Sequence, residues 1–450
     1  MKKTNLILSA LAIVAMAAGC KEEPAPNPYA TDAYQGVVIN EISAHDEQKD
    51  VDTWIEIANT SSNDIDISNL NLYLSDELFD GRALADFAGK TLKAGEKMVF
   101  STSDETLRNG FASNADFTLV LGVTATEGVL DKFEKGEMKK LPVPGSYQRL
   151  PDGTGEWKHT PSASKGRENR VLTLENTTTN AIWLWAAHSA DWLENDCAVM
   201  KQIKASGIDH ILLNFAAFAD NRIKNTRKFL EKAAEHDLFV HIWMQAFYQG
   251  GWVSPVIDEE NRYDQELFDT IVAEAKMYVE EYGAQGIHLD YIRFGGTAYK
   301  HNPSREVTAV GAVNECCRQV REAVDACADG IVMSAAMMAE NNAAYYYGQN
   351  PAMMCEWIDI FMPMIYRHKA YGVKNSDDWC KSAAKLFTQQ TKSQVWAGIT
   401  TYQYEGETVV SLPAEEIRSD AEVFLDTKCT GIVLFRYGLG TYPDLTDLWK

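Results

Sequence analysis

Eight apolar runs, separated by long amphipathic stretches, constrain the fold of the second half of this chain more than any other feature. Continuous apolar strands joined by helices predict a parallel sheet. Eight such units predict a closed (β/α)8 barrel over residues 181–450. An open, doubly wound sheet is the alternative, which the lack of a Gly-rich phosphate fingerprint disfavours. The runs are Ala181–Ala187, Ile208–Phe215, Leu238–Phe247, Gly286–Phe294, Ile331–Ala339, Ile358–Tyr366, Gln394–Tyr402 and Gly431–Tyr437.

Residues 36–169 follow a different pattern, in which short runs of alternating residues are separated by turn residues. Strands of this length and spacing predict an all-β sandwich. A polar linker over residues 170–180 joins it to the barrel. The clearest runs are Val37–Ile42, Trp54–Asn59, Leu70–Leu74, Lys97–Phe100 and Phe117–Leu121.

The first 20 residues have the features of an export signal. Lys2 and Lys3 precede an apolar stretch that ends in Ala17-Ala18-Gly19-Cys20. This segment resembles a bacterial lipoprotein signal, which implies lipidation at Cys20. Residues 21–35 begin with Lys21-Glu22-Glu23, which resembles a surface-export signal, and read as an extended tether. We therefore expect a lipid-anchored protein of the outer membrane, exposed on the cell surface.

Charge and cysteine spacing exclude several classes of function. The net charge of −22 argues against nucleic acid as a partner, since phosphate binding needs clustered Lys and Arg. Cys20 aside, seven cysteines remain without a CxxC spacing, which disfavours a zinc or redox site. The first barrel run lacks a His-x-His pair, and no Gly-x-Ser-x-Gly elbow is present. We expect no metal and no cofactor.

Polar and aromatic residues follow the predicted barrel strands, at the end where such barrels hold their active sites. Flat rings cover apolar sugar faces, and planar amides and acids pair with hydroxyls, so this rim predicts a carbohydrate ligand. For His241 and His288 a satisfied core histidine is the alternative. The predicted substrate-binding residues are Trp185, Asn214, His241, Trp243, Gln245, His288, Arg293, Tyr366, Arg367, Tyr402 and Arg436.

Glycoside cleavage needs two carboxyls across the scissile bond. Asp290 and Glu340 come from adjacent predicted strands and both lie at the predicted rim; neighbouring strands are about 4.8 Å apart. This spacing suits the separation of about 5–5.5 Å in a retaining pair. We therefore predict Asp290 as nucleophile and Glu340 as acid/base. The alternative for Asp290 is a structural ion pair with Arg293, buried at the end of the strand. The alternative for Glu340 is an exposed acid in a loop. Glu405 is the reserve candidate for the second carboxyl.

Two segments of the chain, one in each predicted domain, resemble known families. Val38-Ile39-Asn40-Glu41-Ile42, Trp54–Asn59 and Ser146–Gly153 resemble the lamin-tail domain, an immunoglobulin-like sandwich. This implies a module for attachment or recognition with a protein or glycan ligand; a spacer is the alternative. Gly286-Ile287-His288-Leu289-Asp290-Tyr291-Ile292-Arg293 resembles the strand-four motif of glycoside-hydrolase-like (β/α)8 families.

The second resemblance also bears on mechanism. The α-amylase and α-galactosidase barrels carry their nucleophilic Asp at the end of strand four, which implies that role for Asp290. Met362–Tyr366 looks like strand six of chitinase-type barrels, but their strand-four acid corresponds to Ile292 here, which puts a chitinase mechanism in doubt. The sequence thus indicates a surface glycoside hydrolase. A non-catalytic glycan-binding lipoprotein and an adhesion protein acting through the sandwich are the alternatives.

Overall fold

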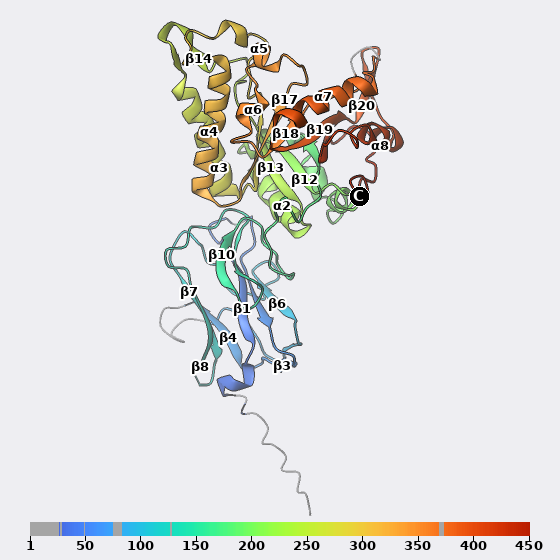
Figure 1. The fold of residues 1–450 in the computed structure, drawn as a ribbon. Helices are drawn as coiled ribbons and strands as arrows, with labels where there is room; N and C mark the ends of the chain where they lie inside the picture. The colour runs from blue at the N-terminus through green and yellow to red at the C-terminus, as the bar shows by residue number, and fades with distance from the viewer. Residues whose placement is uncertain (1–26, 28, 49, 75–82, 127, 369–372) are drawn as a thin grey trace, which may run out of the picture.

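The computed structural model describes residues 27–450 apart from 28, 49, 75–82, 127 and 369–372. A sandwich of strands is followed by a barrel with helices around it (Figure 1). The expected signal segment, Cys20 and residues 21–26 and 28 of the tether lie outside the described residues. Within the described residues no helix has both the length and the apolar character needed to cross a bilayer.

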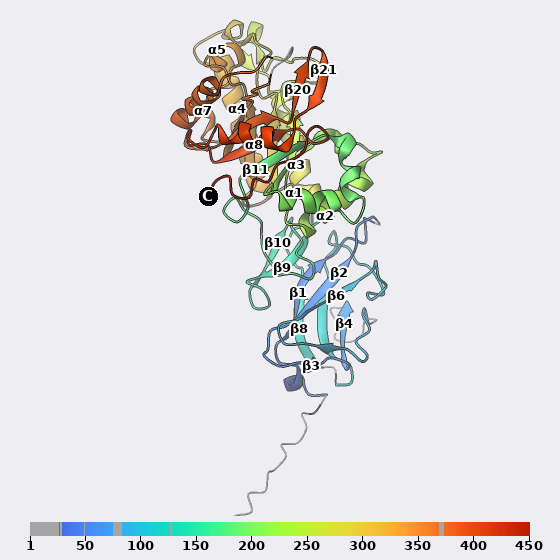
Figure 2. The same ribbon diagram turned by 90° about the vertical axis from the view of Figure 1, so that its right-hand side faces the viewer.

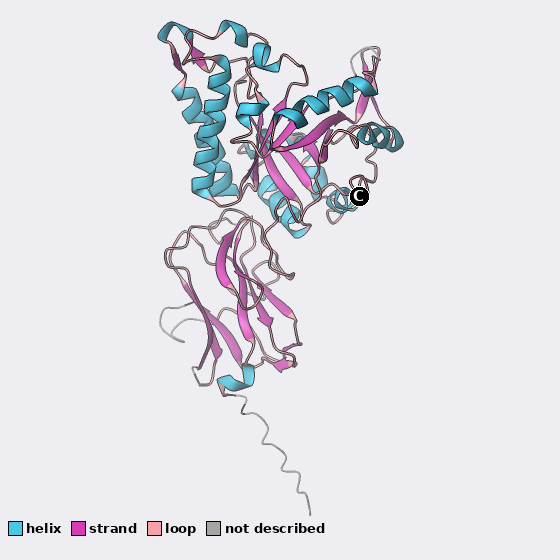
Figure 3. Ribbon diagram, in the orientation of Figure 1, coloured by secondary structure: helices cyan, strands magenta, loops and turns pink. Residues whose placement is uncertain are grey.

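The first domain is a β-sandwich, as the alternating runs predicted. Its main sheets have the strand orders β10-β9-β1-β2-β6 and β4-β7-β8. Figure 3 shows the strands of the sandwich in magenta. Tyr34, in the short 3-10 helix η1 (Thr31–Tyr34), packs in its core, so this domain begins before residue 36. The strands are β1 (Val37–Ser43), β2 (Trp54–Asn59), β3 (Ile65–Asp66), β4 (Leu70–Leu74), β5 (Thr91–Leu92), β6 (Lys97–Ser101), β7 (Thr118–Val123), β8 (Gly128–Glu134), β9 (Ser146–Leu150) and β10 (Glu156–Thr160).

The second domain is a closed barrel of eight parallel strands, which confirms the predicted fold. Its strands are β11 (Asn180–Leu184), β12 (His210–Asn214), β13 (Phe239–Gln245), β16 (Gly286–Asp290), β17 (Val332–Met337), β18 (Ile360–Pro363), β19 (Gln394–Thr400) and β22 (Gly431–Phe435). Its helices are α1 (Ala198–Ala205), α2 (Ile223–Glu235), α3 (Gln265–Tyr282), α4 (Ala309–Cys327), α5 (Ala343–Tyr347), α6 (Pro351–Met354), α7 (Asp377–Gln390) and α8 (Ala414–Glu422). Two hairpins extend its loops: β14 (Val256–Ile257) with β15 (Arg262–Tyr263), and β20 (Tyr402–Glu405) with β21 (Thr408–Ser411).

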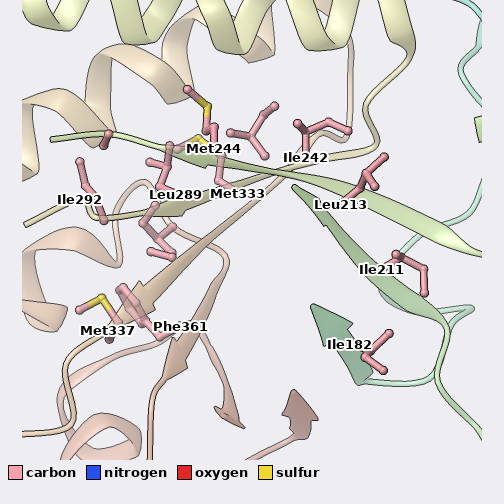
Figure 4. Packing of buried hydrophobic residues seen from close by; sticks show 14 of the residues in the cluster. Ile182, Ile211, Leu213, Ile242, Met244, Leu289, Ile292, Met333, Met337 and Phe361 are labelled. Atoms are coloured by element: carbon pink, nitrogen blue, oxygen red, sulfur yellow. The ribbon is translucent and has the colours of Figure 1, made fainter. Parts of the chain in front are cut away.

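Side chains alternate between two faces of each barrel strand. Leu289 of β16 points outward and packs with Ile242 and Met244 of β13 in the layer beneath the helices (Figure 4), and Ile287 belongs to the same buried cluster. The alternate residues His288 and Asp290 therefore share the inner face of the barrel. This alternation decides which of the predicted site residues can reach a ligand at the barrel mouth.

The fourth barrel strand ends sooner than its apolar pattern indicates. The run predicted to reach Phe294 ends as a strand at Asp290, because Tyr291 adopts a left-handed backbone with φ of 53°. A bulky residue in this region is an outlier that costs free energy. The turn leaves Tyr291 beside Asp290 at the end of the strand.

The sandwich is docked on the end of the barrel where the strands begin. Lys139 Nζ donates to the Cys327 carbonyl at 2.7 Å, and Gln285 Nε2 donates to Ser162 Oγ at 2.7 Å. Asp237 forms ion pairs with Arg167 and Arg170. Asp237, Gln285 and Cys327 precede β13, β16 and β17, so the carboxyl ends of the strands lie opposite the sandwich (Figures 1 and 2).

All seven cysteines of the described residues are unpaired. Six of them are buried, and Cys355 is half-buried. Burial raises the pKa of Cys317 to about 12 and that of Cys429 to about 11. The Cys317 and Cys429 thiols are therefore protonated packing groups rather than reactive thiolates.

Candidate active site

A cavity of about 370 Å³ lies at the carboxyl end of the barrel strands. Its size falls in the usual range for small-ligand pockets. Seven of the residues predicted from sequence line this cavity together: Trp185, Asn214, Trp243, Gln245, Asp290, Arg293 and Tyr366. Trp183, Phe215, Tyr291, Ala336, Met364 and Phe435 complete its lining. We refer to it as the Asp290 pocket.

Both oxygens of the Asp290 carboxyl are held by N–H donors. Trp243 Nε1 donates to Oδ2 at 2.9 Å, and the Tyr291 backbone N–H donates to Oδ1 at 2.7 Å. Burial raises the pKa of Asp290 above its ordinary value, whereas these two hydrogen bonds act in the opposite direction. A fixed carboxyl with a shifted pKa in a pocket is a candidate catalytic group.

Arg293 lies among aromatic rings rather than in an ion pair with Asp290. Its guanidinium carbon is 4.6 Å from the ring centre of Trp252, 5.4 Å from that of Tyr347 and 5.5 Å from that of Tyr291. Its Nε is buried without a hydrogen-bond partner among the described residues. Desolvation lowers the pKa of the guanidinium, although both Asp290 and Glu340 favour its charge. A buried ion pair between Asp290 and Arg293, which was the structural alternative, therefore does not hold the end of this strand.

Glu340 does not line the Asp290 pocket. It is exposed and lines an adjoining cavity of about 500 Å³, which shares Arg293, Met364 and Tyr366 with that pocket. Pairing of Leu289 with Ala335 makes Ala336, not Glu340, the nearest β17 neighbour of Asp290. The expectation that neighbouring strands bring the two carboxyls into one cavity is thus corrected: they lie in two cavities with a common wall.

Tyr402, another of the predicted substrate-binding residues, lines this second cavity. Trp379 from α7 and Tyr404 from β20 line it as well. Burial raises the pKa of Tyr402 to about 12, so its phenol is a neutral hydrogen-bonding group near pH 7. The second cavity therefore also combines aromatic rings with a carboxyl.

His241 and His288 lie inside the barrel below the pocket, and their exposed fractions are 0%. His241 Nε2 is 3.0 Å from His210 Nδ1, and a Cβ on Gly286 would collide with the His241 ring. Burial lowers the pKa of His241 to about 3, so its ring is neutral. This placement corresponds to the core-histidine alternative and corrects the prediction that these rings contact the substrate.

His288 instead supports the floor of the pocket. Its Nε2 accepts a hydrogen bond from Trp183 Nε1 at 3.4 Å, and its Nδ1 is 2.9 Å from Ser334 Oγ. Accepting at Nε2 implies that Nδ1 carries the proton and donates to the hydroxyl. His288 thereby orients Trp183, which is 2% exposed and forms part of the pocket lining.

The two remaining predicted arginines also lie outside both cavities. Arg367 forms ion pairs with Asp377 and with Asp420, whose side chain is 1% exposed. It holds the segment after β18 to α8 and lines neither cavity, and its predicted role in substrate binding stays a prediction. Arg436 places its guanidinium carbon 4.6 Å from the ring centre of Trp185, at the wall of the Asp290 pocket.

Sequence reasoning missed Trp183, Tyr291 and Phe435. Trp183 could have been found from period-two alternation, because it precedes Trp185 by two residues on the same inward face. Phe435 ends the eighth strand in the same way, but Tyr291 reaches the pocket only through its left-handed turn. The described residues contain no cluster of three or more His, Cys, Asp or Glu side chains with metal-ligand geometry.

Comparisons with known proteins give three results. No curated protein sequence matches the chain. Solved structures with similar folds include the spore cortex-lytic enzyme SleL of Bacillus cereus, with 13% identity, a TM-score of 0.44 and coverage of 63% of this chain and 76% of that chain. A chitinase from Chromobacterium violaceum has 12% identity, a TM-score of 0.44 and coverage of 60% and 96%.

The PgaB (BpsB) glycoside hydrolase domain from Bordetella bronchiseptica has 9% identity, a TM-score of 0.44 and coverage of 57% and 94%. The third result concerns the sandwich, whose residues 30–139 match the family model described as Lamin Tail Domain. Strands β9 and β10 follow the matched residues and complete its larger sheet. The chain thus carries a lamin tail domain in front of a parallel eight-stranded barrel.

Proposed function

We propose that the barrel hydrolyses glycosidic bonds of a poly- or oligosaccharide at the Asp290 pocket. The observation that carries this proposal is a carboxyl, held by two N–H donors, in a pocket walled by aromatic rings at the carboxyl end of the strands. This is the end at which such barrels hold their active sites. Apolar ring faces suit the C–H faces of a sugar, while Asn214 and Gln245 suit its hydroxyls.

The distribution of exposed rings supports the same proposal. Among the described residues, the exposed large aromatic side chains are Tyr29, Trp185, Trp252, Tyr299, Tyr345, Tyr346 and Trp379. All but Tyr29 lie in segments that follow barrel strands, on the same end of the molecule as the pocket. Exposed aromatic surface gathered around a pocket indicates a ligand with apolar faces.

In the proposed mechanism Asp290 is the nucleophile and Glu340 the acid/base. An Asp290 oxygen attacks the anomeric carbon, the glycosidic C–O bond breaks, and the leaving oxygen takes the proton of Glu340. Glu340 then takes a proton from water, whose oxygen attacks the same carbon and releases Asp290. Two displacements retain the anomeric configuration. A sugar chain that occupies both cavities would meet Asp290 in one and Glu340 in the other, with Arg293 lining both.

Release of reducing ends from soluble starch, xylan, pectin and glycol chitin tests the proposal. Wild-type protein is expected to cleave at least one of these, and Asp290→Asn and Glu340→Gln to lose cleavage without losing affinity. Proton NMR of the first product is expected to show the retained anomer. An inverted product would exclude Asp290 as nucleophile, and full activity of Asp290→Asn would refute the proposal.

The second candidate function is glycan binding without cleavage. The specific observation in its favour is that Glu340 lies in the adjoining cavity rather than in the pocket of Asp290. Retardation of wild-type protein in gels that contain one of the four polysaccharides, with no release of reducing ends from any, would support this candidate and exclude hydrolysis.

We also propose that the protein is anchored through Cys20 to the outer membrane and exposed at the cell surface. The support is the sequence around Cys20, together with docking of the sandwich on the barrel end opposite the pocket. Labelling of the protein in cells with a clickable palmitate analogue is expected for wild type and not for Cys20→Ala. Loss of the barrel on protease treatment of intact cells would show surface exposure, and its persistence would contradict it.

A further inference from the structure

Three exposed tyrosines form a cluster beside the Asp290 pocket, which we name the tyrosine platform: Tyr299, Tyr345 and Tyr346. Their exposed fractions are 43%, 57% and 41%. Tyr299 belongs to the 3-10 helix η6 (Ala298–Lys300) after β16, and the other two belong to α5 after β17. Figures 1 and 2 show α5 at the end of the molecule far from the sandwich.

The rings of the platform are ordered against each other. The Tyr299 and Tyr345 rings are parallel within 4°, with centres 5.0 Å apart. Tyr346 stands perpendicular to both, 4.9 Å from Tyr345 and 6.1 Å from Tyr299. Their hydroxyls form no hydrogen bond with any described residue. A groove of about 320 Å³ runs beside them, with small side chains such as Ala298, Ala309 and Ala344 in its lining.

The folding of the barrel does not account for this cluster. Rings that stabilise a core are buried, and scattered single rings need no explanation, but adjoining exposed rings leave apolar surface in water. Three aromatic side chains gathered from two separate loops therefore indicate a ligand that covers them.

A continuous run of side chains joins the platform to the Asp290 pocket. Tyr346 lies 6.3 Å from Tyr347, and Tyr347 lies under the guanidinium of Arg293. The same guanidinium covers Tyr291, which lines the pocket. The exposed ring of Trp252 lies 5.5 Å from that of Tyr291. A chain leaving the pocket can thus meet aromatic surface as far as Tyr299.

We infer that the tyrosine platform is a second binding site for the glycan chain whose bond is cut at Asp290. This inference rests on the proposed function, since the occupant is the continuation of the same substrate. One feature favours a sugar chain over a protein: the exposed large apolar residues of η6 and α5 are all rings, without exposed aliphatic side chains.

Affinity electrophoresis tests this inference in gels that contain soluble starch, xylan, pectin or glycol chitin. The Asp290→Asn protein serves as the parent, so that the polymer is not cut during the run. Adding Tyr299→Ser and Tyr345→Ser is expected to weaken retardation about fivefold to tenfold in apparent affinity, as expected when two ring contacts are lost. Tyr299→Phe with Tyr345→Phe is expected to keep the retardation, because the rings remain.

Tyr29→Ser is the matched control, because Tyr29 is 46% exposed but precedes the sandwich. Equal thermal midpoints for the Ser and Phe variants show that folding is unchanged. Equal retardation of the platform variant and its parent, or retardation of the parent in none of the four gels, would overturn the inference. In the cleaving protein, the two Ser substitutions are expected to raise KM for the polymer and to leave cleavage of a trisaccharide unchanged.

The two proposals can fail separately. If wild-type protein cleaves the polymer and the platform variants have the same KM as wild type, the platform is not a binding site, whereas the proposal of hydrolysis stands. Platform-dependent retardation without cleavage by wild-type protein refutes hydrolysis and leaves a glycan-binding platform.

Discussion

The chemistry of the Asp290 pocket depends on a few residues that share the inward face of neighbouring strands. Pairing of Trp243 with His288 and of Gln245 with Asp290 places the Trp243 indole beside the Asp290 carboxyl. The indole N–H stabilises the charged form of that carboxyl, while burial favours the neutral form. The pKa of Asp290, and with it the pH at which it can attack, therefore depends on Trp243.

Trp243→Phe is expected to move the acid limb of kcat/KM to higher pH. Asp290 must be ionised to act as nucleophile, and its activity is lost as pH falls through its pKa. Removing the N–H donor raises that pKa further, while the phenyl ring keeps part of the wall. The pH profile of kcat/KM for wild type and variant measures the shift, and a limb that stays in place or moves to lower pH would contradict the assignment.

The left-handed backbone of Tyr291 is expected to lower the free energy of unfolding of any variant that has a side chain at this position. Tyr291→Gly and Tyr291→Ala both remove the ring, but only glycine adopts a positive φ without strain. The Gly variant is therefore expected to be more stable than the Ala variant by about 1 kcal/mol in free energy of unfolding. Urea denaturation of the two variants measures this difference, and an Ala variant as stable as the Gly variant would exclude strain at this position.

The elements that surround the pocket are held by polar contacts which the sequence did not indicate. Asp420 of α8 accepts from His368 Nε2 at 2.7 Å and from Arg367 Nη1 at 2.6 Å. These contacts tie the segment after β18 to α8. Arg367 therefore contributes to stability, and it lines neither cavity.

Arg367→Gln is expected to lower the free energy of unfolding by roughly 2–4 kcal/mol, because it leaves the buried Asp420 carboxylate with fewer partners. KM is expected to change less than about twofold, since the side chain lines neither cavity. Arg262→Gln is the matched control, because its ion pair with Glu260 is exposed and contributes little. A large rise in KM with unchanged stability would show that Arg367 binds the substrate and would contradict its role in stability.

The barrel could be predicted from sequence because apolar runs and helical periods report burial directly. The strand-end rule also placed Trp185, Asn214, Trp243, Gln245 and Asp290 at one pocket. It failed where the backbone departs from regular strand geometry. The left-handed turn at Tyr291 ends β16 early, and the segment after β17 carries Glu340 into the adjoining cavity. Such departures depend on tertiary contacts that a periodic pattern does not contain.

At the scale of the whole molecule, the sandwich and barrel form a connected pair. Residues 162–170 bind both parts: Ser164 and Gly166 donate to Glu41 and Glu56 of the sandwich, and Arg167 pairs with Asp237 of the barrel. These contacts hold the pocket at the end of the barrel away from the N-terminal end of the sandwich. The predicted recognition role of its lamin tail domain stays a prediction.

Asp237→Lys is expected to separate the two parts, because it replaces the partner of Arg167 and Arg170 with a like charge. Small-angle X-ray scattering is expected to show a larger radius of gyration for this variant than for wild type. Asp196→Lys changes the charge equally at an exposed site and is expected to leave the radius unchanged. Equal radii for Asp237→Lys and wild type would show that these ion pairs do not hold the domains together.

Cleavage by Asp290 is tested most directly by the rate at which Asp290→Asn releases reducing ends from the polysaccharide that wild-type protein cuts. If Asp290 is the nucleophile, this rate is expected to be at least about a thousandfold lower than that of wild type, with unchanged retardation by that polysaccharide. A variant that cuts within about tenfold of the wild-type rate would contradict it.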